Sequence, residues 1–188
     1  MELISRRDAG RILMAGAAGL MAGRAGLSGA TKIDSKVRGV QIGAQSYSFR
    51  DRALDPCIEA YKTVGLGECE LWSGHLEPRG LKPPEVRKWH LTVPLSHFQD
   101  VRQKFDNAGI TLFAYTYGFR KDFTDEEIER GFQEAKALGV RTITSSANVS
   151  TAARVDKFAV KYGINRACAV SHHPENSPTV QLCKFKQR

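Results

Sequence analysis

Carboxylate, imidazole and aromatic side chains gather in one stretch, "GAQSYSFRDRALDPCIEAYKTVGLGECELWSGHLEP", which runs from Gly43 to Pro78. Glu70 and His75 within it have side chains suited to proton transfer near neutral pH. Strand alternation places Glu70 and Trp72 on one face. A carboxylate on the inner face of a sheet needs a partner or a raised pKa, which makes Glu70 a candidate functional residue.

Each candidate in this stretch also has a structural interpretation. Glu70 could be held by Arg50 or by a backbone amide, and His75 could serve only to cap a turn. Glu77-Pro78 indicates a turn. Further along, we predict that His90 and His97 lie on the surface.

A second group of polar residues lies near the C-terminus, in "AVSHHPEN". Two imidazoles and a carboxylate suit zinc or manganese, which makes His172, His173 and Glu175 the metal-ligand candidates. Three neighbouring ligands in one loop, without partners later in the chain, form an incomplete site.

The elements that position these residues follow one repeated pattern, in which a helix ends at glycine and a short apolar strand follows. The four glycines that we expect to end helices in the left-handed conformation are Gly65, Gly109, Gly139 and Gly163. The strands are expected at residues 40–47, 69–72, 112–117 and 142–145.

The helices carry start signals and apolar stripes. Asp55-Pro56 pairs a helix cap with a proline at the first helical position, and Thr124 with Glu127 forms a capping box. Apolar residues at spacings of three and four mark the buried faces of three helices. These residues are Phe98, Val101, Phe105 and Ala108; Ile128, Phe132, Ala135 and Leu138; and Val155, Phe158, Ala159 and Tyr162.

Strands that alternate with helices predict an α/β protein with a parallel sheet. An open doubly wound sheet should have a glycine-rich turn after its first strand, and "QSYSFRDRA" has none. Polar and aromatic residues follow the strand ends, as in a (β/α)8 barrel. We therefore predict a partial (β/α)8 TIM barrel of four to five βα units, with a proline-rich loop inserted at residues 73–95.

Composition sets the general class of the protein. The 188 residues are 41% hydrophobic and 26% charged, which is ordinary for a globular domain. The net charge of +8 comes partly from the two ends of the chain, so no nucleic-acid surface is predicted. The four cysteines, Cys57, Cys69, Cys168 and Cys183, show no CxxC pair, and no disulfide is predicted.

The first thirty residues have the features of an export signal. Arg6-Arg7 precedes the apolar stretch "ILMAGAAGLMAG", and Ser28 to Ala30 supply small residues for cleavage. The adjacent arginines indicate a twin-arginine signal at residues 1–30 and a periplasmic protein, although Ala9 replaces the usual large apolar residue. An amphipathic N-terminal helix is the alternative.

The motifs "VQIGAQSYSFRDR", "GLGECELWSGHLEP" and "AGITLFAYTYGF" resemble the sugar phosphate isomerase/epimerase family with the xylose isomerase-like barrel, in its exported branch. The resemblance covers residues 38–165. It implies a divalent metal, Mn, Mg or Zn, that assists proton transfer beside a sugar carbonyl. It also implies that Glu70 and His75 face the substrate, with Trp72, Tyr47, Phe49, Tyr115 and Tyr117 as aromatic walls. Barrel packing is the alternative for Tyr115 and Tyr117.

A complete barrel needs roughly 250 residues. Residues 166–188 depart from the pattern, and we expect an irregular tail, a shifted reading frame near residues 165–170 and an inactive fragment without a bound metal. An open half-barrel also exposes strand edges that favour self-association.

The expected partner is a sugar or sugar phosphate, with neither nucleic acid nor a stable membrane anchor. A non-catalytic periplasmic sugar-binding or assembly protein is the alternative function.

Overall fold

A computed structural model of the chain describes residues 30–145, 149–170 and 181–182. The chain divides into two units, Met1–Ala30 and Thr31–Arg188, and every helix and strand described below belongs to the second. The expected leader and the candidate ligands His172 and His173 lie outside the described residues. No described helix combines the length and apolar character needed to cross a membrane.

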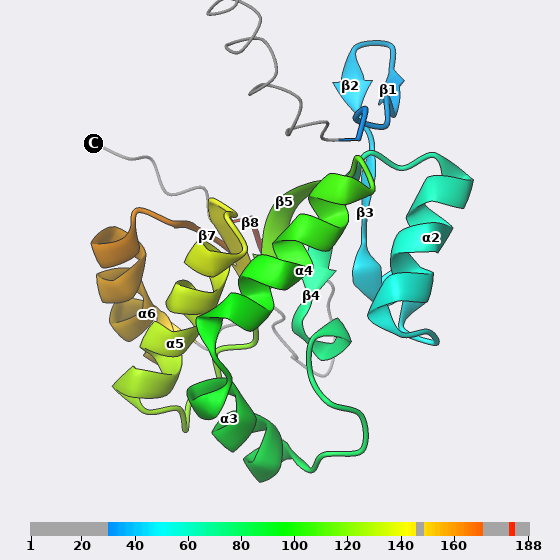
Figure 1. The fold of residues 1–188 in the computed structure, drawn as a ribbon. Coiled ribbons are helices and arrows are strands. Elements are labelled where there is room, and N and C mark those ends of the chain that lie inside the picture. Colours follow the sequence, from blue (N-terminus) through cyan, green and yellow to red (C-terminus); the bar gives the residue numbers. More distant parts are fainter. Residues whose placement is uncertain (1–29, 146–148, 171–180, 183–188) are drawn as a thin grey trace, which may run out of the picture. The chain divides into compact units, whose positions relative to one another are not determined.

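Five parallel strands pair in chain order, which confirms the predicted parallel sheet (Figure 1). A short strand, β8 (Gln181–Leu182), pairs antiparallel with the last of them. The five are β3 (Gly43–Gln45), β4 (Glu68–Trp72), β5 (Thr111–Thr116), β6 (Thr142–Ser145) and β7 (Asn165–Val170).

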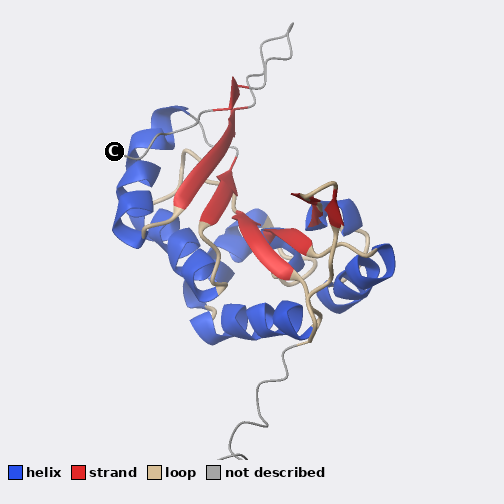
Figure 2. Ribbon diagram, turned by 90° about the horizontal axis from the view of Figure 1, so that it is seen from above, coloured by secondary structure: helices blue, strands red, loops and turns tan. Residues whose placement is uncertain are grey.

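Helices connect successive strands and lie along one side of the sheet (Figure 2). Four of them are the expected helices, and α4, α5 and α6 pack side by side in that order. The capping box of Thr124 and Glu127 is present at the start of α5. The four are α2 (Leu54–Val64), α4 (Leu95–Asn107), α5 (Asp125–Ala137) and α6 (Val149–Tyr162).

Glycine ends these helices as predicted. Gly65, Gly109, Gly139 and Gly163 have φ values of 80°, 73°, 68° and 62°. This left-handed conformation carries no steric penalty in glycine, and it lets the chain leave the helix and enter the next strand.

The first strand differs from the prediction. Residues 40–47 do not form one strand, because β2 (Val40–Gln41) folds back on β1 (Lys36–Val37) and β3 begins only at Gly43. Arg38 and Gly39, at the turn between β1 and β2, have φ values of 50° and 83°. Two consecutive positive φ values are typical of the tight turns that close two-residue hairpins.

The insert after β4 also differs from the prediction, since it contains a helix, α3 (Pro83–Thr92). Its two prolines occupy the first helical positions, where the missing N–H costs no hydrogen bond. The Glu85 carboxylate accepts a bond from the Lys82 N–H at 2.7 Å, which caps the same end. The prolines therefore begin this helix instead of marking a loop.

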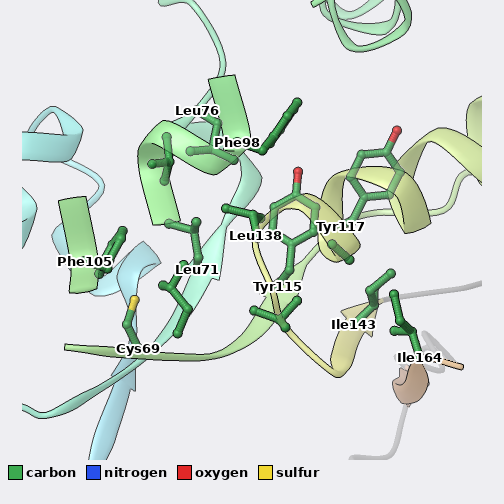
Figure 3. Packing of buried hydrophobic residues seen from close by; sticks show 14 of the residues in the cluster. Cys69, Leu71, Leu76, Phe98, Phe105, Tyr115, Tyr117, Leu138, Ile143 and Ile164 are labelled. Atoms are coloured by element: carbon green, nitrogen blue, oxygen red, sulfur yellow. The ribbon is translucent and has the colours of Figure 1, made fainter. Parts of the chain in front are cut away.

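The core lies between the sheet and its helices (Figure 3). Cys69 and Leu71 of β4 point into it, together with Tyr115 of β5 and Ile143 of β6. Because side chains alternate along a strand, the residues between these positions point to the opposite face. That inner face carries the polar residues of the candidate site.

Candidate functional site

Polar side chains from three other strands converge on Glu70 of β4. The Gln45 side-chain amide of β3 donates to Glu70 Oε1 at 2.7 Å. The hydroxyl groups of Thr116 in β5 and Thr144 in β6 donate to the same oxygen at 2.7 and 2.5 Å. Since the strands are parallel, all four residues lie near the carboxyl-terminal edge of the sheet. We call these four residues the inner polar cluster.

The strand register produces this convergence. Gln45 lies directly opposite Glu70 in the β3–β4 pairing, and Thr116 lies opposite Thr144 in the β5–β6 pairing. Between β4 and β5 the register shifts after Cys69, so that Glu70 pairs with Ala114. A small side chain opposite Glu70 leaves room for the carboxylate to reach the hydroxyl groups.

The two oxygens of Glu70 have different surroundings. Among the described residues, all three hydrogen bonds reach Oε1, and none reaches Oε2. Neither Arg50 nor a backbone amide, the partners expected from the sequence, bonds to Glu70 within the part of the chain that the structure describes. Arg50 instead lies over the ring of Tyr47, 4.7 Å from its centre. Within the described residues, the carboxylate is therefore held in place through Oε1 alone.

His75 joins the loops that follow β3 and β4. Its Nδ1 lies 2.9 Å from Ser46 Oγ, and its Nε2 lies 3.3 Å from the Phe49 carbonyl oxygen. A carbonyl only accepts, so we assign the proton to Nε2 and infer that the Ser46 hydroxyl donates to Nδ1. Ser46 Oγ in turn accepts the Trp72 N–H at 2.8 Å. Burial lowers the pKa of His75, which keeps the ring neutral at pH 7.

Aromatic rings border the inner polar cluster on one side. The rings of Tyr47 and Trp72 meet edge to face at 4.9 Å, and Tyr47 is 44% exposed. Trp72 also contacts the ring of His75 edge to face, at 5.5 Å. Phe49 packs against Tyr61 at 5.2 Å, which ties it to the core. Of the predicted aromatic walls, Tyr47 is therefore exposed, and Trp72 lies beside it.

Tyr115 and Tyr117 lie on the helix side of the sheet, which corrects their expected role as aromatic walls of a site at Glu70. They are 0% and 4% exposed and point into the core on the helix side (Figure 3). The Tyr115 hydroxyl donates to Glu134 Oε2 at 3.0 Å. Burial raises the pKa of Tyr115 far above its ordinary value, so the hydroxyl stays protonated.

A buried ionic cluster, which the sequence analysis missed, lies beside these tyrosines. His90, predicted to be on the surface, is 5% exposed, and its Nδ1 lies 2.8 Å from Oε1 of Glu134, which is 0% exposed. Its Nε2 lies 3.2 Å from Oε1 of Glu77, predicted only to form a turn. Arg130 Nε also approaches Glu134, at 3.4 Å. The cluster links α3, α5 and the loop after β4.

The carboxylates determine the charge of His90. Burial by itself lowers the pKa of an imidazole, but the hydrogen bonds from Glu134 and Glu77 outweigh this and raise the pKa of His90 to about 9. Burial raises the pKa of Glu77, and the hydrogen bond to His90 reverses this and lowers it. His90 is thus a cation between two carboxylates at neutral pH.

The sequence did contain a signal for this cluster. Glu134 follows Gly131 by three residues and precedes Leu138 by four, which places it on the buried stripe of α5. A carboxylate on an apolar stripe requires a buried cationic partner.

His97 was also expected on the surface, but it packs against the rings of Trp89 and Phe98, and its Nε2 is buried.

The described residues do not form a metal centre by themselves. No group of three or more His, Cys, Asp or Glu side chains suited to a metal ion occurs in the part of the chain that the structure describes.

Burial raises the pKa of Cys57 to about 11 and that of Cys69 to about 12. Both are protonated, free core residues, as expected.

Comparisons with known proteins support the fold. No family model and no curated protein matches the chain. An uncharacterized protein from Parabacteroides distasonis is 19% identical, with a TM-score of 0.53 over 68% of this chain and 52% of that one. A sugar phosphate isomerase/epimerase from the same organism is 14% identical, with a TM-score of 0.50 over 78% and 60%. The chain thus spans about half to three-fifths of these structures, and its α/β fold with parallel strands corresponds to part of a TIM barrel.

Proposed function

We propose that this chain forms the sugar-binding face of a sugar isomerase/epimerase-like barrel. The observation that carries the proposal is the asymmetry of Glu70, whose Oε1 is held by three donors while its Oε2 accepts no bond from the described residues. The likeness to a sugar phosphate isomerase/epimerase supports the same class.

The geometry suits a polyhydroxylated ligand. Oε2 of Glu70 would accept a bond from a sugar hydroxyl, and the exposed ring of Tyr47 beside Trp72 would contact the C–H groups of the sugar. Fixing the carboxylate in advance lowers the entropy lost on binding. In an isomerase, a carboxylate held in this way would also take a proton from the carbon beside the carbonyl.

Sugar binding without catalysis is the second candidate function, and the surroundings of His75 favour it. Both ring nitrogens of His75 already have partners in Ser46 and Phe49. His75 is thereby a positioning residue that connects two loops, and Glu70 is the one ionisable side chain in the inner polar cluster.

Deuterium exchange separates the two candidate functions. The full chain is incubated with D-fructose in deuterated buffer, with and without Mn²⁺, and the sugar is examined by NMR. Deuterium at the carbon beside the carbonyl would support proton transfer. Binding without exchange would support the sugar-binding function, and the absence of both would refute the proposal.

We also propose that residues 1–30 direct export to the periplasm. The adjacent Arg6 and Arg7, followed by an apolar stretch, support this proposal. Fractionation of cells that express the full chain tests it. The periplasmic fraction should contain the protein, and replacement of both arginines by lysine should retain it in the cytoplasm.

A further inference from the structure

A cavity of about 240 Å³ lies at the carboxyl ends of β4 and β5, on the helix side of the sheet. The wall residue Tyr117 belongs to the face that carries Tyr115, and Glu70 and Thr116 belong to the opposite face. None of the residues that line the cavity belongs to the inner polar cluster. Its lining includes Ser73, Glu77, Val86, His90, Tyr117 and Phe123.

Two walls of different chemistry form the cavity. Glu77 and His90 contribute an ion pair at 3.2 Å on one side. Val86 and Phe123 contribute apolar surface, and the Arg87 guanidinium lies over the Phe123 ring at 4.9 Å. A ligand that combines hydroxyl and C–H groups matches both walls.

The charges around the cavity cancel. His90 pairs with Glu77 and Glu134, and Arg130 also pairs with Glu134. On the other side, Arg87 pairs with Asp122 and Glu127, and Arg120 pairs with Asp122. Four cations thus balance four carboxylates. An ionic ligand would leave a charge uncompensated in a partly desolvated site, which is costly.

Hydrogen-bonding capacity remains at the cavity wall. The Tyr117 hydroxyl reaches the Glu127 carbonyl only at 3.5 Å, the outer limit of a hydrogen bond. The Arg120 side chain is 63% exposed and contacts Asp122 at 3.4 Å. A Cβ atom added at Gly118, also in the lining, would meet no atom within 4 Å, so this part of the cavity is open.

We propose that this cavity is a second binding site, separate from the Glu70 site, for a small uncharged polyol. Glu77 accepts hydroxyl groups of the polyol, Tyr117 and Arg120 donate to it, and Val86 and Phe123 contact its C–H groups. The volume lies below the roughly 300–1,000 Å³ of pockets for drug-sized ligands, which limits the ligand to about the size of a pentitol. The site does not depend on the proposed function at Glu70.

Titration of the full chain with xylitol, followed by amide NMR, tests the site. Concentrations up to about 50 mM cover millimolar dissociation constants. We expect shifts at Glu77, His90 and Gly118, and no response at these amides to inorganic phosphate. Phosphate shifts without xylitol shifts, or no shift with either probe, would overturn the proposal.

Three variants sharpen this test, each checked first for a folded spectrum. Gly118→Val places methyl groups in the open part of the cavity and should weaken xylitol binding at least about tenfold. Glu77→Gln leaves one uncompensated cation and should weaken xylitol binding while allowing phosphate to bind. Glu70→Gln alters only the opposite face and should leave the xylitol affinity unchanged. Xylitol binding that is lost in Glu70→Gln and retained in both other variants would contradict a separate site.

Discussion

Nδ1 of His90 lies 2.8 Å from Oε1 of Glu134, a carboxylate with no exposed surface. This contact joins α3 to α5, and the other ring nitrogen joins α3 to Glu77 in the loop that carries His75. A cation between two carboxylates thus fixes the segment that follows β4. Removal of either partner leaves a buried charge without compensation.

Glu134→Gln should lower the free energy of unfolding by about 3–5 kcal/mol, because it leaves the buried His90 cation with one carboxylate fewer. Urea denaturation measures the change. Glu126→Gln is the matched control, since Glu126 lies on the same helix and is exposed. We expect a change within about 0.5 kcal/mol for the control. Equal effects of the two substitutions would show that the His90–Glu134 contact contributes nothing.

The stability should fall as the pH rises from about 6.5 through about 9. The pKa of His90 is raised from 6.5 in the unfolded chain to about 9 in the folded one. Between these two pKa values the folded state binds more protons than the unfolded state. The stability that His90 contributes is therefore fully present below pH 6.5 and is lost as the pH rises through about 9. At about 1.4 kcal/mol per pKa unit, the loss is roughly 3 kcal/mol.

His90→Gln is the control for this pH dependence, because it removes the titrating group and retains hydrogen-bonding capacity. Urea denaturation of both proteins at pH 6, 8 and 10 gives the comparison. The variant should be less stable at pH 6 and should lose less stability than the wild type as the pH rises. If the free energy of unfolding falls equally with pH in the wild type and the variant, the pH dependence arises from groups other than His90.

Ser46→Ala should remove one of the two hydrogen bonds that hold the His75 ring. The change removes the acceptor of the Trp72 N–H and the partner of His75 Nδ1, which should cost about 1–3 kcal/mol of stability. It should also raise the pKa of His75, since the hydroxyl that stabilises the neutral ring is gone. NMR titration of the imidazole protons measures this shift. Ser48→Ala, at an exposed position two residues on, should alter neither quantity.

Gly131→Ala should destabilise the protein by about 1–3 kcal/mol through overpacking. A Cβ atom at this position would lie 2.7 Å from two ring carbons of Tyr117. Gly118→Ala makes the same chemical change where the new atom meets nothing within 4 Å, and it should be tolerated. Thermal denaturation compares the two variants. Similar melting temperatures would show that Tyr117 packs differently from the structure described here.

The sequence was most informative where local chemistry determines the backbone. Gly65, Gly109 and Gly139 end helices as predicted, because no other residue adopts a positive φ so readily. The strands at Glu70 and Tyr115 were also found, since short apolar runs between helices leave few alternatives. Pro83 was wrongly assigned to a loop, because the sequence alone does not distinguish a proline that begins a helix from one that ends it.

The sites were harder to predict because they depend on partners far away in the chain. Glu70 was found from strand alternation, but its bonds to Thr116 and Thr144 follow from a register shift that periodicity does not encode. The link from His90 to Glu134 spans 44 positions in the sequence. The role of Tyr115 and Tyr117 as walls of the sugar site came from the resemblance alone, and the structure buries both side chains on the helix side of the sheet.

Calorimetric titration of the full chain with D-fructose tests the role of Glu70 most directly. Glu70→Gln should weaken binding at least about tenfold, equivalent to about 1.4 kcal/mol. Glu68→Gln, on the same strand and face but at its amino-terminal end, should bind like the wild type. Equal affinity of all three proteins, or equal loss in both variants, would contradict a sugar site at the carboxyl-terminal edge of the sheet.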